Sequence, residues 1–168
     1  EICACLVGSE MCIRDSSTPA AKDIVILYTN DAHCGIEDGM GYQGLSAAKR
    51  ALLAAGNKVL LVDNGDAVQG DTIGTLSKGE YIIDIMNKLG YDVATPGNHE
   101  FDYRSKGLAN MLTSARTSGD AVPAIVVCNV DWDAMESAGL TEGQQLLKDA
   151  FAAYGVQDYT VAEGRCAH

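Results

Sequence analysis

The sequence is poor in several features, and each shortage argues against a class of protein. Aromatic residues make up only 6% of its 168 residues, so the core must be mostly aliphatic. No apolar run approaches the ~20 residues of a membrane-spanning helix, so no transmembrane segment is expected. The six cysteines include no CxxC pair, which argues against a zinc ribbon and against a dithiol redox motif.

Positive charge is scarce as well. The 12 lysines and arginines are outnumbered by 23 aspartates and glutamates, and the formal net charge is −11. Such a surface repels phosphate backbones, so polymeric nucleic acid is not expected as a partner. A small anionic substrate needs a place where the local charge is reversed, and a bound metal ion would provide one.

The N-terminal 22 residues, EICACLVGSEMCIRDSSTPAAK, stand apart from the rest of the chain. ICACLVG and the small residues of SSTPAA could be the remnant of a signal peptide. Alternatively, the segment is foreign junction sequence, and the resemblance of CLVGSEMCIRDS to a translated sequencing adapter favours this interpretation. Residues 1–22 are therefore set aside as a non-domain leader. With 47% hydrophobic residues, the chain has enough apolar material for one domain over residues 23–168.

Hydrophobic periodicity predicts strands that alternate with helices along this domain. The predicted strands are 23–28, 58–63, 91–96, 123–130 and 158–164, and the predicted helices are 45–56, 79–90 and 105–119, with a further short helix around Leu146 and Leu147. Strands and helices that alternate at this spacing predict an α/β fold, with a mostly parallel sheet and flanking helices.

Metal-type ligands follow each of the first three predicted strands. Asp31 and His33 follow the first strand, Asp66 follows the second, and Asn98 and His99 follow the third. Extended backbone would direct the side chains of Asp31 and His33 to the same side. Because ligands of open α/β sheets bind outside the carboxyl ends of the strands, the three loops are expected to meet at one edge.

These residue types narrow the chemistry of the site. Carboxylate, amide and imidazole ligands without a thiolate suit Zn, Mn, Fe or a mixed pair. Asp66, between the other two ligand sets, could bridge two cations ~3.5–4 Å apart that clamp a phosphate and activate a water. His99 is expected to point away from these ligands, with Asp102 orienting its ring. Such a pair suits the stabilisation or protonation of a departing ester oxygen.

Three motifs resemble those of a known family. TNDAHCG (29–35), DNGDAVQG (63–70) and GNHEFDY (97–103) resemble the first three motifs of the calcineurin-like metallophosphoesterases, and more narrowly the 5′-nucleotidase and UDP-sugar hydrolase family. The resemblance implies an αββα sandwich. It also implies an exported or cell-surface enzyme that takes phosphate from nucleoside monophosphates or cleaves nucleotide sugars.

The resemblance also assigns roles by position. Asp31 and His33 would bind the first of two divalent metals, Asp66 would bridge both, and Asn98 would bind the second. His99 and Asp102 would form the catalytic pair.

The sequence departs from the family after the third motif. The later GH and GHxH metal-binding segments are absent, as are the aromatic residues that hold the base, so no substrate-binding residue is identified. Four ligands are few for two metals. The domain is therefore expected to be an N-terminal portion that lacks its C-terminal remainder. Two alternatives stay open: a catalytically incomplete fragment, or a related phosphoesterase that acts on cyclic nucleotides or other phosphate esters.

Neighbours of the motif residues are expected to have structural roles. Glu100 is expected to cap a backbone segment or to form a salt bridge, rather than to act in catalysis. Phe101 is predicted to belong to the core, and Cys34 is predicted to be a small buried residue rather than a metal ligand. Gln69 is expected to be a solvated loop residue.

Overall fold

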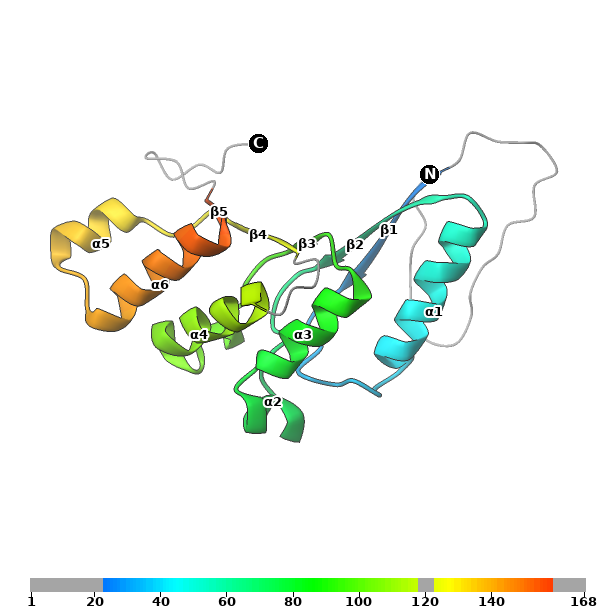
Figure 1. Cartoon of the computed structure of the whole chain (residues 1–168), viewed down its shortest axis with the longest axis horizontal. Coiled ribbons are helices and arrows are strands. Elements are labelled where there is room, and N and C mark those ends of the chain that lie inside the picture. Colours follow the sequence, from blue (N-terminus) through cyan, green and yellow to red (C-terminus); the bar gives the residue numbers. More distant parts are fainter. Residues whose placement is uncertain (1–22, 118–122, 159–168) are drawn as a thin grey trace.

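The computed structural model describes residues 23–117 and 123–158 (Figure 1). The leader 1–22 and most of the predicted strand 158–164 lie outside the described residues. In chain order the elements are β1 (Ile24–Thr29), α1 (Gly41–Ala54), β2 (Lys58–Asp63), α2 (Thr72–Ser77), α3 (Glu80–Leu89), β3 (Val93–Ala94), the 3₁₀ helix η1 (His99–Phe101), α4 (Arg104–Thr117), β4 (Ala124–Val127), α5 (Trp132–Ala138), α6 (Glu142–Tyr154) and β5 (Gln157–Asp158). No helix among these residues is long and apolar enough to cross a membrane.

The strands form one parallel sheet in the order β1-β2-β3-β4-β5. This confirms the predicted α/β class. Each strand is followed by a crossover to its next neighbour, and right-handed crossovers that all run in one direction put their helices on the same face of the sheet. Figure 1 shows α1, α3, α4 and α6 on that side of the strands.

The core lies between the sheet and these helices. Leu27 of β1 and Leu61 of β2 are paired in register and buried. Ile82 of α3 and Met111 of α4 are fully buried and belong to the same hydrophobic cluster. The apolar side chains that recur with period 2 in the strands and with period 3.6 in the helices therefore pack into a single core.

The opposite face of the sheet is largely exposed. The side chains that point away from the helices are exposed, with Ile24 at 72%, Tyr28 at 62% and Ile26 at 44%. Leu60, on the same face of β2, is 37% exposed. Among the described residues there is one sheet, so the second sheet of the expected αββα sandwich remains a prediction.

Three helices differ from the expectation, and each is capped by a local polar signal that hydrophobic periodicity does not detect. α2 and α5 are not among the predicted helices; Asp71 caps α2 by accepting a hydrogen bond from the Thr72 N–H, and Asp131 caps α5 by accepting one from the Ala134 N–H. The helix around Leu146 and Leu147 is longer than expected, since Thr141 and Gln144 form a reciprocal capping box at its start.

Candidate metal centre

The loops after β1 and β2 are held together by their backbones. The Asp31 N–H donates to the Gly65 carbonyl at 3.1 Å, and the His33 N–H donates to the Asp66 carbonyl at 2.9 Å. The Cys34 N–H donates in the same way to the carbonyl of Ala67, the next residue of the second loop. Two motifs more than 30 residues apart in the sequence are thus brought into register beyond the ends of their strands.

The loop after β3 packs directly against the loop after β2, and glycine makes this possible. The His99 N–H donates to Asp66 Oδ1 at 2.7 Å. A Cβ on Gly97 would lie 2.4 Å from that same oxygen, and a Cβ on Gly65 would lie 2.5 Å from the Gly97 nitrogen. No side chain fits between these backbones.

The first two loops use left-handed backbone at the motif residues themselves. Positive φ occurs at Asp31 (53°), His33 (44°), Cys34 (62°) and Asp66 (58°). The expected extended conformation of Asp31–His33 is therefore wrong. Non-glycine residues in this region are strained, and strain of this kind concentrates at functional sites.

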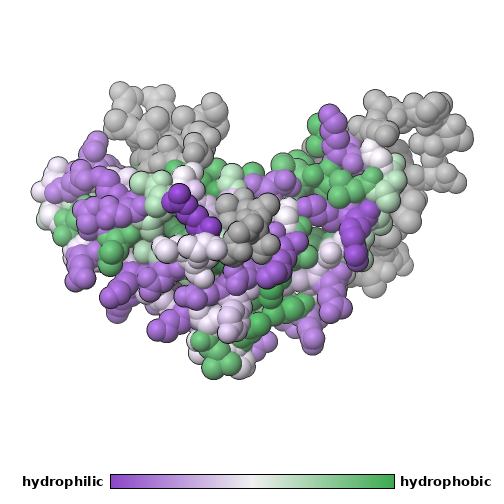
Figure 2. Space-filling view, viewed as in Figure 1, coloured by the Kyte–Doolittle hydropathy of each residue, from purple (hydrophilic) through white to green (hydrophobic). Residues whose placement is uncertain are grey.

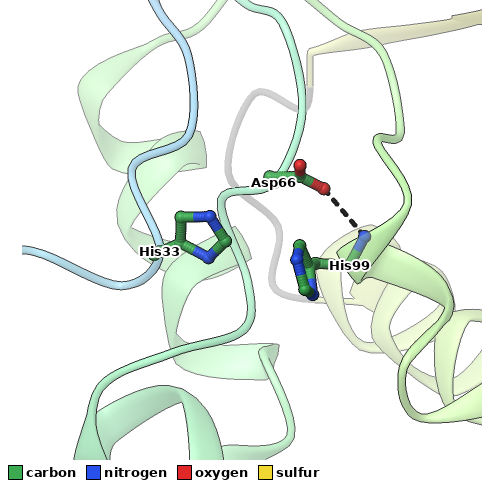
Figure 3. Close-up of side chains that lie close together, drawn as sticks. All are labelled: His33, Asp66 and His99. Atoms are coloured by element: carbon green, nitrogen blue, oxygen red, sulfur yellow. Dashed lines mark hydrogen bonds between the residues drawn. The ribbon is translucent and has the colours of Figure 1, made fainter.

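Three side chains from the three loops lie close enough to share one cation. His33, Asp66 and His99 each offer a ligand atom, and these atoms lie within 4.8 Å of one another (Figure 3). The two imidazole rings meet edge to face, with centroids 4.9 Å apart. The expectation that His99 points away from the metal ligands is therefore wrong.

Both histidines have one ring nitrogen already occupied. His33 Nδ1 lies 3.0 Å from the Gln69 carbonyl, which can only accept, so the proton is on Nδ1 and Nε2 is free. His99 Nδ1 is held by Asp102 in the same way. A second nitrogen fixed in this way is typical of metal-binding histidines, so His33 and Asp66 fit a divalent cation, and His99 Nε2 can either join them as a ligand or stay protonated as a donor beside them.

The other two predicted ligands lie beside this cluster. Asp31 is exposed, and its Oδ1 is 3.8 Å from His33 Nε2. Its other oxygen accepts a hydrogen bond from the Asn30 amide. Asn98 is exposed at the start of η1, next to His99 in the chain. The tertiary structure thus brings all four predicted ligands to the same end of the sheet.

His99 and Asp102 form the predicted pair. One turn of 3₁₀ helix separates them, and Asp102 Oδ2 lies 2.8 Å from His99 Nδ1. This hydrogen bond, supported by the charge of Asp102, raises the pKa of His99 above its ordinary value. The higher pKa keeps more of the ring protonated at a given pH, and Nε2 is the ring nitrogen that Asp102 leaves available.

Two buried carboxylates under the site were not predicted as functional residues. Asp63, only 5% exposed, accepts the Thr29 hydroxyl at 2.6 Å and the Gly65 N–H at 3.0 Å, and burial raises its pKa to about 6. Glu100, 6% exposed, accepts backbone N–H groups from both neighbouring loops and forms no salt bridge within the described chain. The sequence signal for Asp63 was its place at the end of an apolar strand.

Predictions for three neighbouring residues have mixed outcomes. Cys34 is fully buried as predicted, and burial raises the pKa of its thiol to about 11, which disfavours the thiolate form. Phe101 is 40% exposed, so its assignment to the core is wrong. Gln69 is half-buried rather than solvated, and it contributes its carbonyl to His33.

A cavity of about 470 Å³ lies next to Cys34, between the first loop and the start of α2. Its acidic lining comes from Glu37, Asp38 and Asp71, and its apolar lining includes Leu76 of α2. Figure 2 shows hydrophobic side chains gathered over α2, where Leu76 is 78% exposed. Three carboxylates repel a phosphate, so this cavity does not suit the anionic end of a substrate.

Comparisons with known proteins agree with this geometry. The calcineurin-like phosphoesterase family matches residues 24–162, well over half of the chain. The chain therefore belongs to this family. The snake venom 5′-nucleotidase of Gloydius brevicauda is 37% identical over 121 residues, which cover 64% of this chain and 20% of that protein.

Two further relatives extend the comparison. A 2′,3′-cyclic-nucleotide 2′-phosphodiesterase/3′-nucleotidase of Salmonella typhimurium is 33% identical over 122 residues, or 62% of this chain and 19% of that protein. The solved 5′-nucleotidase precursor from Thermus thermophilus matches with a TM-score of 0.54 at 29% identity, over 63% of this chain and 22% of that one. The chain thus spans about a fifth of the length of these relatives.

Proposed function

We propose that this chain belongs to a phosphoester hydrolase of the 5′-nucleotidase type, which releases phosphate from nucleoside monophosphates. The observation that carries the proposal is the convergence of His33, Asp66 and His99 within 4.8 Å, with the His99 ring held by Asp102. The family and the 5′-nucleotidase relatives support the same class of reaction. The resemblance of the motifs extends the proposal to nucleotide sugars.

The site residues divide into ligands and a proton-donating pair. Asp31 and His33 would hold one divalent cation, Asn98 would hold a second, and Asp66 would bridge them. Cations such as Zn²⁺ or Mn²⁺ would supply the positive charge that an anionic phosphate needs and would activate the attacking water. No thiolate competes in this set, which suits such metals.

His99 would act on the leaving group. Its Nδ1 is held by Asp102, so its Nε2–H is the donor that remains. The raised pKa keeps more of the ring protonated near neutral pH, and a charged donor can stabilise or protonate the departing ester oxygen. Asp102 would fix the orientation of the ring and the position of its proton.

The experiment replaces Asp66, the residue shared by both proposed metals. Asp66→Ala should abolish binding of Mn²⁺ or Zn²⁺, measured by isothermal titration calorimetry, and any metal-dependent release of phosphate from a nucleoside 5′-monophosphate. The matched control is Asp133→Ala, which removes an exposed carboxylate in the first turn of α5 and should change neither quantity. Unchanged metal affinity in Asp66→Ala would refute the proposed site.

Two alternatives make different predictions in the same assays. A catalytically incomplete chain would bind metal but would not turn over any phosphate ester. The exposure of Ile24 and Tyr28 on an apolar face of the sheet supports this alternative. A relative of different specificity would prefer cyclic nucleotides, and the Salmonella typhimurium relative supports this one. Assays with 2′,3′-cyclic and 5′-monophosphate substrates at equal metal concentration separate the possibilities.

Export to the periplasm or the cell surface is part of the same proposal. The relative found in snake venom supports it. Cell fractionation of the source organism, with an antibody to this chain, tests it. Recovery of the protein in the cytoplasm alone would contradict export.

A further inference from the structure

Glu100 connects two of the three loops that build the candidate metal centre. Its Oε2 accepts the Asp66 N–H at 2.9 Å and the Gly97 N–H at 2.5 Å. Its Oε1 accepts the Ala67 N–H at 2.9 Å and the Val68 N–H at 3.3 Å. The side chain is 6% exposed, so these four N–H groups satisfy it in place of water.

These donors come from both sides of the interface between the loops. Three follow β2 and include the N–H of Asp66 itself, and the fourth, from Gly97, follows β3. On the other side of the Asp66 residue, its carboxylate accepts the N–H of His99, the neighbour of Glu100 in η1. Asp66 is therefore fixed at its backbone by Glu100 and at its side chain by the backbone of η1.

The carboxylate is the group that suits this place. Its two oxygens are both acceptors, and an ionised carboxylate can accept about four hydrogen bonds. A glutamine of the same shape would put an NH₂ group against two N–H donors, whichever way its amide is turned. An aspartate would be one methylene too short to span from η1 to the loop after β2 in the same way.

We infer that Glu100 is a positioning residue for metal binding: it ties the Asp66 loop to the His99 loop so that their ligand atoms converge on one point. The inference rests on the proposed function and deepens it, because Glu100 is not one of the proposed ligands and would act only through their positions. The strain of left-handed backbone at Asp66 (φ 58°) supports this role, since that conformation needs surrounding contacts to hold it.

The test is Glu100→Gln in the full chain, with two readouts. Isothermal titration with Mn²⁺ should show an affinity ~10–100-fold below that of the wild type, the usual effect of losing a residue that orients metal ligands. Amide hydrogen exchange, measured without metal, should show faster exchange at Asp66, Ala67, Val68 and Gly97. The matched control is Glu142→Gln in α6, an exposed site that loses the same charge and should leave both readouts unchanged.

Fold integrity separates positioning from general stability. Far-UV circular dichroism and thermal melting identify the temperature range in which each variant is folded, and affinity is compared within that range. If Glu100→Gln does not fold, Glu100→Asp replaces it in the test. This variant keeps the charge but shortens the tether, so its metal affinity should fall below that of the wild type, and an unchanged affinity would overturn the inference.

The possible outcomes are distinct. A folded Glu100→Gln variant that keeps wild-type metal affinity overturns the inference and leaves the proposed function standing. A wild-type chain that binds no Mn²⁺ overturns the proposed function. The inference is then decided by the exchange experiment alone, in which unchanged protection at these four amides would refute the tether.

Discussion

The buried carboxylate of Asp63 should make the stability of the fold depend on pH in a specific direction. Burial is the largest cause of its raised pKa, which is about 6 instead of the ordinary 3.8. Hydrogen bonds from Thr29 and Gly65 oppose the shift without cancelling it. Ionisation is therefore more difficult in the folded chain than in the unfolded chain.

The sign follows from this difference. Below the unfolded pKa both states are protonated, and Asp63 costs no stability. As pH rises from about 4 through 6, the unfolded state releases the proton more easily, so the folded state is progressively penalised. The pKa difference of 6 − 3.8, or about 2 units, corresponds to about 3 kcal/mol lost by pH 8, at 1.36 kcal/mol per unit.

Asp63→Asn should remove this penalty, because an amide fits the same partners without a charge. The amide oxygen of the variant would accept the Gly65 N–H, and its NH₂ would donate to the Thr29 oxygen. The Thr29 hydroxyl, whose oxygen is 2.9 Å from that of Tyr91, would then donate to Tyr91. The variant should gain stability over the wild type as pH rises, by up to about 3 kcal/mol at pH 8 and by little at pH 4.

Urea unfolding followed by circular dichroism at pH 4, 5, 6, 7 and 8, with a chelator present, measures this difference. The control is Asp133→Asn, whose exposed side chain stays in water in both states, so its stability relative to the wild type should vary little with pH. A constant stability difference between Asp63→Asn and the wild type across this range, or one that falls with pH, would refute the reasoning.

Two further predictions concern the metal centre. His99→Ala should preserve metal affinity but reduce turnover of a nucleoside 5′-monophosphate by ~10²–10⁴-fold, the usual contribution of acid–base assistance. If calorimetry shows that the variant no longer binds metal, His99 is a ligand instead. Gly97→Ala should force Asp66 to shift, because its Cβ would lie 2.4 Å from Asp66 Oδ1, and should destabilise the fold by about 1–3 kcal/mol. Thermal melting checks the second prediction against Gly143→Ala, where the nearest atom is 3.7 Å away, and equal melting temperatures for the two variants would contradict it.

The placement of the site could be predicted from the sequence to a large extent. Apolar runs at 23–28 and 58–63 marked the first two strands, and the polar motif residues came directly after them. Parallel strands end at the same edge, so convergence of the loops followed from topology. The orientation of the His99 side chain could not be predicted in this way, because it depends on how η1 packs against the loop that holds His33.

The prediction that Glu100 caps backbone groups is confirmed, but which groups it caps, and any role for Asp63, could not be predicted for a related reason. The N–H groups that Glu100 accepts at residues 66, 67 and 68 lie 32 to 34 positions away in the chain. Residue types do not show which backbone N–H groups need an acceptor, since every residue except proline has one. A buried acid without a basic partner in its own segment therefore gave no sign of what satisfies it.

By itself, the sequence determined the alternation of strands and helices, the parallel sheet and the set of polar residues at the strand ends, because periodicity and turn residues act over short distances. Only the tertiary structure decided which of those residues meet. Crossovers in a single direction put the helices on one face and leave Ile24 and Tyr28 uncovered on the other. Contact between loops, rather than strand geometry, sets the left-handed backbone at Asp31 and Asp66 and brings His99 against His33.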